Sequence, residues 1–174
     1  MSEQNLVRKI QSGDKAAMNE MISKYYQPVF AFFCKNVGNY HQAKDLTQEV
    51  FMKMAAGISK YRSKTPFKNW LFTIASNHLK NYYRTISRRP ENYELSEDYP
   101  APDNEVDKIL ILSDTQAALT RLPIEQKEAV ILRFYYGFSI HDISKITDAK
   151  ESTVKARIRY GLEKLKNELE GYDE

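Results

Sequence analysis

Apolar residues recur at three- and four-residue steps along most of this chain, a spacing that places them on one face of an α-helix. Met21, Tyr25 and Phe32 belong to one such series. No segment alternates apolar and polar residues with the two-residue period of a strand, and the 174 residues include only six glycines and six prolines. We therefore expect an all-α protein.

Helices are predicted throughout the first half of the chain. Ser2 is placed to cap the first helix, and Gly13 and Asp14 are residue types that end one helix and begin the next. Trp70 lies on the apolar stripe of a later helix, so we expect it in the core. The predicted helices fall within residues 2–36, which hold two of them, 41–54 and 67–86.

The helical pattern stops in a segment rich in acidic residues and proline. Residues 89–105 contain three prolines and few aliphatic side chains, and apolar periodicity resumes near Val106. We expect two small helical domains, residues 1–88 and 106–174, joined by an acidic flexible linker, residues 89–105.

Charge is distributed unevenly, although the net charge is only +3. No acidic residue lies between Glu49 and Glu91, whereas nine Lys and Arg residues do. Residues 91–107 then carry seven acidic residues and no Lys or Arg. A basic block followed by an acidic block indicates a surface that binds a polyanion, beside a segment that the polyanion repels. For either block taken alone, the alternative is a face that is simply exposed to solvent.

A helix-turn-helix is predicted near the C-terminus. Ser139 and Asp142 have the spacing of a capping box, and Asp148 is a residue type that tolerates the left-handed conformation of a short turn. In the next helix the residues predicted to face inward are Val154, Ile158, Gly161, Leu162, Leu165 and Leu169. The opposite face presents Ser152, Thr153, Lys155, Arg157, Arg159 and Tyr160.

Such a face can enter the major groove of double-stranded DNA, because Arg, Lys, Ser and Thr donate hydrogen bonds to bases and phosphates. The alternative is a plain helical hairpin with a solvated basic face.

Two sets of motifs, in order along the chain, closely resemble domains two and four of the extracytoplasmic-function (ECF) sigma factors of the sigma-70 family. The first set is AKDLTQEVF at 43–51 and FKNWLFTIASN at 67–77. The second is LTRLP at 119–123, ILRFYYGFS at 131–139, DIS at 142–144 and TVKARI at 153–158.

The resemblance implies a detachable subunit of bacterial RNA polymerase that directs the enzyme to promoters. Residues 1–88 would be region 2, which docks on core polymerase and recognises and melts the −10 element. Residues 106–174 would be region 4, which binds the −35 element. The resemblance places polymerase docking at Asp45, Gln48, Glu49 and Met52, and these residues fall on the helix face opposite Leu46 and Val50.

The resemblance also implies the DNA contacts. A loop that captures a flipped base matches Tyr61, Arg62, Ser63, Lys64, Phe67, Lys68 and Asn69, and the following helix offers Asn77, Lys80, Asn81, Arg84 and Arg88 to the −10 element. The recognition helix for the −35 element matches Ser152, Thr153, Lys155, Ala156, Arg157, Arg159 and Tyr160.

The chain departs from the common pattern of the family at a few positions. Lys44 stands where an acidic residue is common, and Asn81 stands where Asp is usual. Asp148 replaces the usual turn glycine, and Lys150 replaces a cap-forming Ser or Thr. These departures bear on the docking contacts and the promoter sequence rather than on the function.

The resemblance implies three partners: bacterial core RNA polymerase, promoter DNA and an anti-sigma factor. The contacts with the polymerase would be made by its β′ clamp helices and its β flap. We expect a monomer when free and a cytoplasmic location, because no signal peptide is evident and no apolar run approaches the roughly 20 residues that cross a bilayer. The acidic segment suits either a nucleic-acid mimic or a spacer repelled from DNA.

Other functions remain as alternatives. An enzyme is disfavoured because His41, His78 and His141 lack metal-ligand spacing and Cys34 lies in an apolar run, so we expect no metal and no cofactor. A free-standing helix-turn-helix regulator would bind DNA without polymerase. A third alternative is a decoy that binds polymerase or a sigma antagonist without promoter activity.

Overall fold

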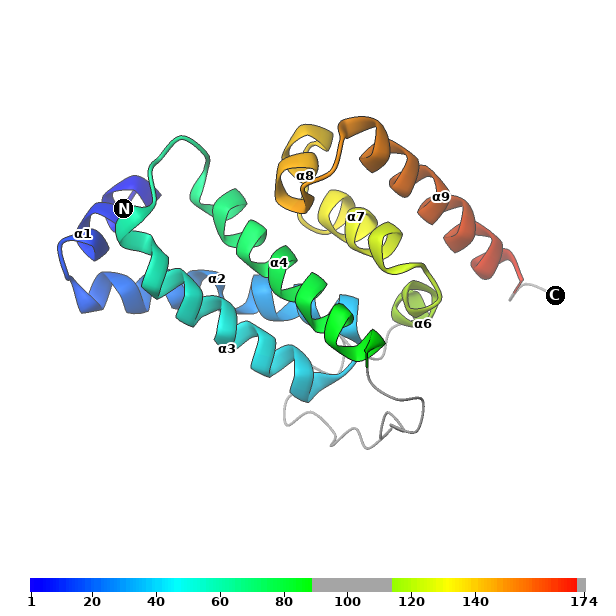
Figure 1. Cartoon of the computed structure of the whole chain (residues 1–174), viewed down its shortest axis with the longest axis horizontal. Coiled ribbons are helices and arrows are strands. Elements are labelled where there is room, and N and C mark those ends of the chain that lie inside the picture. Colours follow the sequence, from blue (N-terminus) through cyan, green and yellow to red (C-terminus); the bar gives the residue numbers. More distant parts are fainter. Residues whose placement is uncertain (89–113, 172–174) are drawn as a thin grey trace.

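The computed structural model describes residues 1–88 and 114–171. The predicted linker from residue 89 and the expected resumption of helix at Val106 lie outside the described residues. The described elements are α1 (Glu3–Gln11), α2 (Lys15–Val37), α3 (Tyr40–Gly57), the 3-10 turn η1 (Ile58–Lys60), α4 (Phe67–Ser87), α6 (Asp114–Thr120), α7 (Ile124–Phe134), α8 (Ile140–Thr147) and α9 (Glu151–Glu170) (Figure 1). The expectation of an all-α protein is confirmed.

The N-terminal module, residues 1–88, begins its helices where the sequence predicts. Ser2 Oγ accepts a hydrogen bond from the backbone N–H of Asn5 at 3.3 Å, and Asp14 Oδ1 accepts one from Ala17 at 3.1 Å. Helix α2 continues through Pro28 and ends at Val37, and the following residue, Gly38, caps it with a φ of 69° that suits glycine. These caps divide the first predicted segment into two helices at the expected place.

The core of this module lies where α2, α3 and α4 pack together. The large side chains with no exposed surface include Met21, Phe32, Phe33, Met54 and Leu71. They come from all three helices, so the apolar stripes predicted by the three- and four-residue spacing meet in one interior.

The C-terminal module, residues 114–171, depends on a close approach of α9 to α7. A Cβ atom added at Gly161 would lie 2.8 Å from Cγ2 of Val130, so only glycine fits this position without a shift. Val154 and Ile158 are buried as predicted. The prediction that Leu162 faces inward is wrong, because this residue is 41% exposed.

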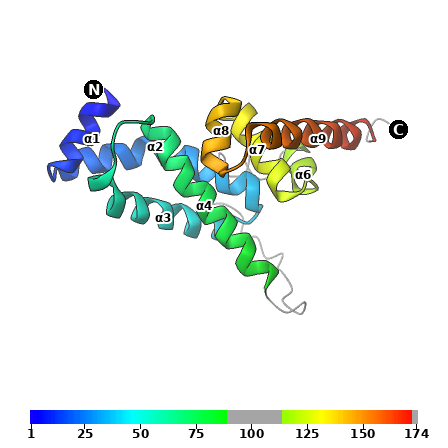
Figure 2. The ribbon, with the colours of Figure 1, turned by 45° about the horizontal axis from the view of Figure 1, so that its top comes forward.

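The two modules pack directly against each other, with α8 beside α4 and with α6 and α7 against α2 (Figures 1 and 2). Phe72 of α4 lies in this contact, with its ring centroid 4.8 Å from that of Tyr136 and 5.3 Å from that of Phe138. The Tyr136 hydroxyl donates a hydrogen bond to the carbonyl of Pro28 at 2.7 Å. The described parts of the two domains therefore share one continuous apolar core.

Candidate nucleic-acid interface

The helix-turn-helix formed by α8 and α9 has the predicted geometry at the start of α8 and at the turn that follows it. Ser139 Oγ accepts a hydrogen bond from the Asp142 N–H at 3.0 Å, and the Ser139 N–H donates to Asp142 Oδ2 at 3.4 Å, which completes a capping box. Asp148 ends α8 with a φ of 51° in the left-handed region. Both predictions are confirmed, and α9 starts three residues after this turn.

An additional side-chain pair joins the two helices of this motif. His141 Nδ1 lies 2.8 Å from Glu151 Oε1, so the first turn of α8 is tied to the first turn of α9. The sequence does not predict this pair, because a spacing of ten residues across a turn is not typical of any helix contact.

The predicted recognition face of α9 is largely open to solvent. Ser152, Lys155, Arg159 and Tyr160 are exposed, whereas Thr153, Ala156 and Arg157 are half-buried. The Arg159 guanidinium lies 4.9 Å from the centroid of the Tyr160 ring. This face offers the hydrogen-bond donors that bases and phosphates accept.

The loop before α4 is held by an aromatic cluster. The Tyr61 hydroxyl donates a hydrogen bond to the Thr65 carbonyl at 2.5 Å, and the Tyr61 ring centroid lies 4.9 Å from that of Trp70 and 5.8 Å from that of Phe67. From α1, Gln11 Nε2 donates to the Tyr61 carbonyl at 3.0 Å. Trp70 packs against the core as expected.

This cluster changes which loop residues can meet a base. Tyr61 and Phe67 are only 7% and 2% exposed, so they hold the loop in place rather than present free rings. Arg62, Ser63 and Lys64 are exposed at the tip of the loop. The physical reason is local, because the two rings pack against each other and against Trp70.

A hollow of about 360 Å³ lies between this loop and the N-terminus of α1. Its lining residues are Ser2, Glu3, Gln4, Val7, Tyr61, Ser63, Lys64, Thr65, Pro66 and Phe67. Glu3 accepts hydrogen bonds from the Tyr25 hydroxyl and from Lys24 Nζ, the latter at 2.7 Å. Burial acts to raise the pKa of Glu3, but these two bonds and the charges of Lys24 and Lys68 hold it below its ordinary value. A carboxylate is therefore fixed at the edge of the hollow.

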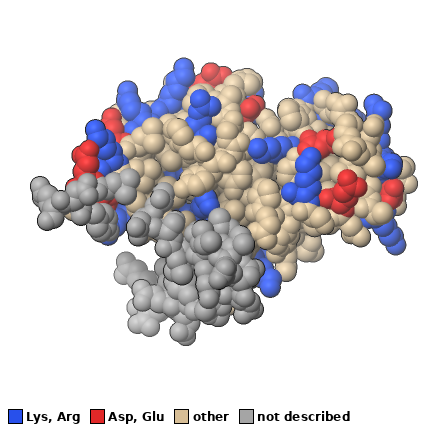
Figure 3. Space-filling model, turned by 180° about the vertical axis from the view of Figure 1, so that it is seen from behind, with Lys and Arg blue, Asp and Glu red and all other residues tan. Residues whose placement is uncertain are grey.

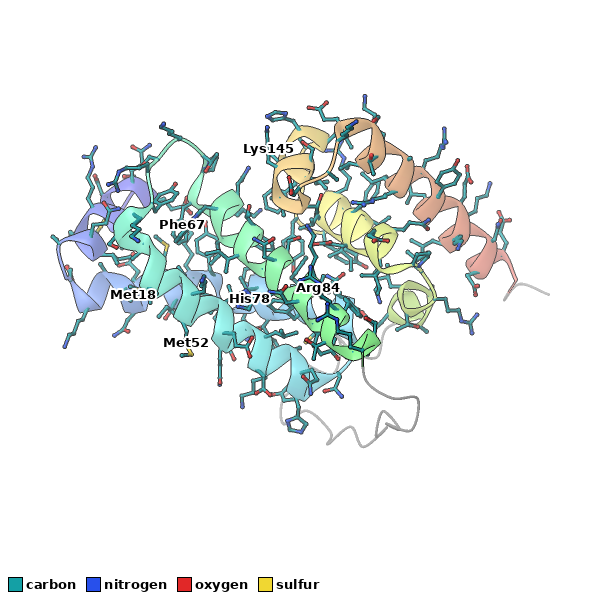
Figure 4. All side chains as sticks on the ribbon, in the orientation of Figure 1. Met18, Met52, Phe67, His78, Arg84 and Lys145 are labelled. Atoms are coloured by element: carbon teal, nitrogen blue, oxygen red, sulfur yellow. The ribbon has the colours of Figure 1, made fainter. Side chains whose placement is uncertain are left out.

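The predicted DNA-contacting residues on α4 divide into two groups. Asn77, Asn81, Arg84 and Arg88 are exposed, and Arg84 lies on the part of α4 beyond the contact with α8 (Figure 4). The half-buried members of the predicted set on α4 are instead bonded to the C-terminal module; they are Lys68, Asn69 and Lys80.

Each of these three side chains donates to a defined acceptor on the C-terminal module. Lys68 Nζ donates to the Tyr136 carbonyl at 3.0 Å, Asn69 Nδ2 donates to Asp142 Oδ1 at 2.9 Å, and Lys80 Nζ donates to the Thr147 carbonyl. The predicted −10 contacts are thus not collected on one open surface in this structure. Lys and Arg side chains lie over both modules on the face seen in Figure 3, interspersed with Asp and Glu.

The predicted docking face on α3 is exposed. Asp45, Gln48 and Glu49 face solvent, and Met52 is 72% exposed and points away from the helical bundle (Figure 4). Leu46 lies on the opposite face of α3 and is 6% exposed. An exposed methionine beside carboxylates is a chemistry suited to contact with another protein.

Within residues 1–88 and 114–171, no three His, Cys, Asp or Glu side chains come together in a way that could hold a metal ion. In the same parts of the chain, no helix is both long enough and apolar enough to cross a membrane.

Comparison with known proteins agrees with the two-part organisation. The family described as sigma-70 region 2 matches residues 21–89, and the family described as sigma-70 region 4 matches residues 112–165. The ECF RNA polymerase sigma-E factor of Haemophilus influenzae is 32% identical to this chain, over 98% of the chain and 96% of that protein.

The fold is similar to that of two proteins of known structure. CnrH, solved in complex with the cytosolic domain of CnrY, aligns with a TM-score of 0.71 and 18% identity over 97% of both chains. The sigma factor RpoE of Bartonella quintana, solved with the anti-sigma factor NepR, aligns with a TM-score of 0.70 and 24% identity over 87% of this chain and 96% of that chain. At these identities the likeness concerns the fold alone.

The helix-turn-helix, the two family matches in order and the full-length relative together show that this chain belongs to the ECF sigma factors of the sigma-70 family, the proteins that direct transcription initiation.

Proposed function

We propose that this protein binds bacterial core RNA polymerase in the cytoplasm and directs it to promoters that carry −35 and −10 elements. The observation that supports this most directly is the pairing of an exposed recognition helix, α9, with an exposed docking face on α3 in a separate module. DNA binding by itself uses only the first of these surfaces. We assign no catalytic role to any residue.

The proposed division of labour follows the two modules. Region 2 spans residues 1–88, the acidic linker spans 89–105, and region 4 spans 106–174. Region 2 docks through Asp45, Gln48, Glu49 and Met52, and region 4 reads the −35 element through the exposed face of α9.

Base capture at the −10 element is proposed for the hollow beside the loop. Arg62 and Lys64 would hold the strand backbone, because cations are the groups that follow phosphates. The hollow of about 360 Å³ offers a partly apolar wall from Val7, Pro66 and the edge of Phe67, together with the carboxylate of Glu3. A base that leaves the stack needs both an apolar surface and edge-reading groups.

Run-off transcription with bacterial core polymerase tests this function, with and without the protein, on a library of promoter-like fragments. We expect selective new transcripts, whose enriched sequences name the −35 and −10 elements. The variant Asp45→Lys should lose transcripts, whereas Lys15→Ala on the exposed start of α2 should not. Tight DNA binding without any transcript would instead support a free-standing regulator. Polymerase binding without promoter activity would support a decoy.

A further inference from the structure

A carboxyl group is buried where the two modules meet. Glu128 of α7 is 3% exposed and Ser76 of α4 has no exposed surface. The Ser76 hydroxyl donates a hydrogen bond to Glu128 Oε1 at 2.5 Å. The two residues lie 52 positions apart, so this bond exists only when the C-terminal module packs on α4. Carboxyl groups are rarely buried to this extent without an ion pair.

The surroundings of Glu128 do not neutralise it. The charged and titratable groups that interact with it are Lys80 and Tyr83 on α4, Arg157 on α9 and Glu125 on its own helix. Among the described residues, none of these forms an ion pair with Glu128. Burial raises the pKa of Glu128 to about 7, and it outweighs the Ser76 hydrogen bond and the charges of Lys80 and Arg157. The packed arrangement therefore favours the neutral carboxyl.

The same contact occupies part of the proposed −10 surface. Lys68, Asn69 and Lys80 each donate a hydrogen bond to the C-terminal module, to Tyr136, Asp142 and Thr147 respectively. Each of these side chains is half-buried and has one of its donors engaged by the C-terminal module, which restricts its approach to DNA. Packing of the modules therefore competes with engagement of the −10 element by these residues.

We propose that the packing of the C-terminal module on α4 is a reversible autoinhibitory contact, and that Ser76 and Glu128 form its pH-sensitive element. The autoinhibition rests on the proposed promoter function, whereas the pH-sensitive opening stands on the interface alone. When the modules separate, Glu128 reaches water and ionises, and Lys68, Asn69 and Lys80 become free for DNA.

The direction of the pH response follows from linkage. In an open form that exposes Glu128 to water, its pKa would return to the ordinary value of 4.5, whereas in the closed form the pKa is about 7. Closing therefore takes up a proton, so the closed form is fully favoured below pH 4.5 and loses its advantage progressively as the pH rises to about 7. The equilibrium should shift toward the open form by on the order of 100-fold across this range.

A distance measurement tests the opening directly. Thr85→Cys on α4 and Lys145→Cys on α8 place a fluorescent donor and acceptor at exposed positions on the two modules of the full chain. Cys34 is 1% exposed and stays in place, and protein without added cysteines checks that it takes no label. We expect energy transfer to fall as the pH is raised from about 5 to about 8.

Three variants test whether Ser76 and Glu128 cause the pH-dependent opening. Glu128→Gln keeps the shape without the charge and should stay closed at every pH. Glu125→Gln, a matched change on the exposed face of α7, should keep the response. Ser76→Ala should open more readily at all pH values and still respond. An unaltered pH profile in Glu128→Gln, or no closed form at any pH, would overturn the proposal.

Transcription assays at about pH 7.5 then test autoinhibition separately from the promoter function. The more closed Glu128→Gln should give several-fold fewer transcripts than the unaltered protein. Full transcription by a closed Glu128→Gln protein would refute autoinhibition while leaving the promoter function intact. A pH-dependent distance in a protein that supports no transcription with core polymerase would refute the proposed function and leave the opening element in place.

Discussion

Asn69 at the start of α4 donates a hydrogen bond from Nδ2 to Oδ1 of Asp142 on α8, at 2.9 Å, across the contact between the two modules. The other oxygen of Asp142 accepts from the Ser139 N–H and closes the capping box of α8. One carboxylate thus stabilises the first helix of the helix-turn-helix and also bonds a predicted −10 residue across the contact between the modules. A change at this position should affect both helix stability and module packing.

We expect Asp142→Ala to lower the free energy of unfolding of the C-terminal module by about 1 kcal/mol, because α8 loses one half of its capping box. Chemical denaturation followed by circular dichroism measures this loss. Asn69→Ala removes only the bond between modules, so it should leave the stability of α8 itself nearly unchanged. Equal losses in the two variants would contradict the separation of roles.

Gly161 should resist substitution because α9 crosses α7 there. Gly161→Ala places a Cβ 2.8 Å from Val130 Cγ2, and we expect a loss of about 1–3 kcal/mol in the free energy of unfolding. Adding Val130→Ala removes the contacting methyl group, so the double variant should lose less stability than the sum of the two single changes. Simple additivity in urea unfolding would show that the close approach is not the cause.

Arg157 should contribute to sequence discrimination at the −35 element. Replacing it with Ala should weaken binding by about 1–3 kcal/mol and relax the preference at one base pair if the side chain reads a base edge. Binding to a panel of single-base variants, measured with the polymerase-bound protein, checks this. Lys164→Ala, further along the exposed side of α9, is the control. A uniform loss across all sequences would mean that Arg157 contacts only phosphate.

The exposed cations of the loop should act in strand opening. Arg62→Ala combined with Lys64→Ala should slow opening and make it less sensitive to salt, because fewer phosphates are neutralised. A fluorescent base analogue in the −10 element follows the rate. Lys9→Ala on α1 removes an exposed cation outside the lining of the hollow and should have little effect. An unchanged opening rate in the double variant would exclude the loop from base capture.

The docking face should depend on Met52 as well as on its carboxylates. Met52 is 72% exposed, and Met52→Ala should weaken binding to core polymerase by on the order of tenfold if it is buried at the centre of that interface. Titration of labelled protein with core polymerase measures the affinity. Lys53→Ala, its exposed neighbour, should bind almost normally. Unaltered affinity in Met52→Ala would place docking elsewhere.

The sequence by itself determined the helices, their caps and the turn of the helix-turn-helix. Ser2, Asp14 and Ser139 cap helices through bonds to residues three positions ahead, and Asp148 adopts the left-handed conformation that its residue type tolerates. Such interactions are short-range, so spacing and residue type are sufficient to predict them.

Only the tertiary structure decided which of the predicted residues are exposed and which are buried or bonded to the other module. Leu162 is exposed, Tyr61 and Phe67 are buried, and Asn69 is bonded to a residue 73 positions away. Glu128 is buried and bonded to Ser76, which lies 52 positions away on the other module. An amphipathic pattern specifies that a helix has an apolar face, but which module covers that face depends on contacts between distant segments, and these leave no local signal in the sequence.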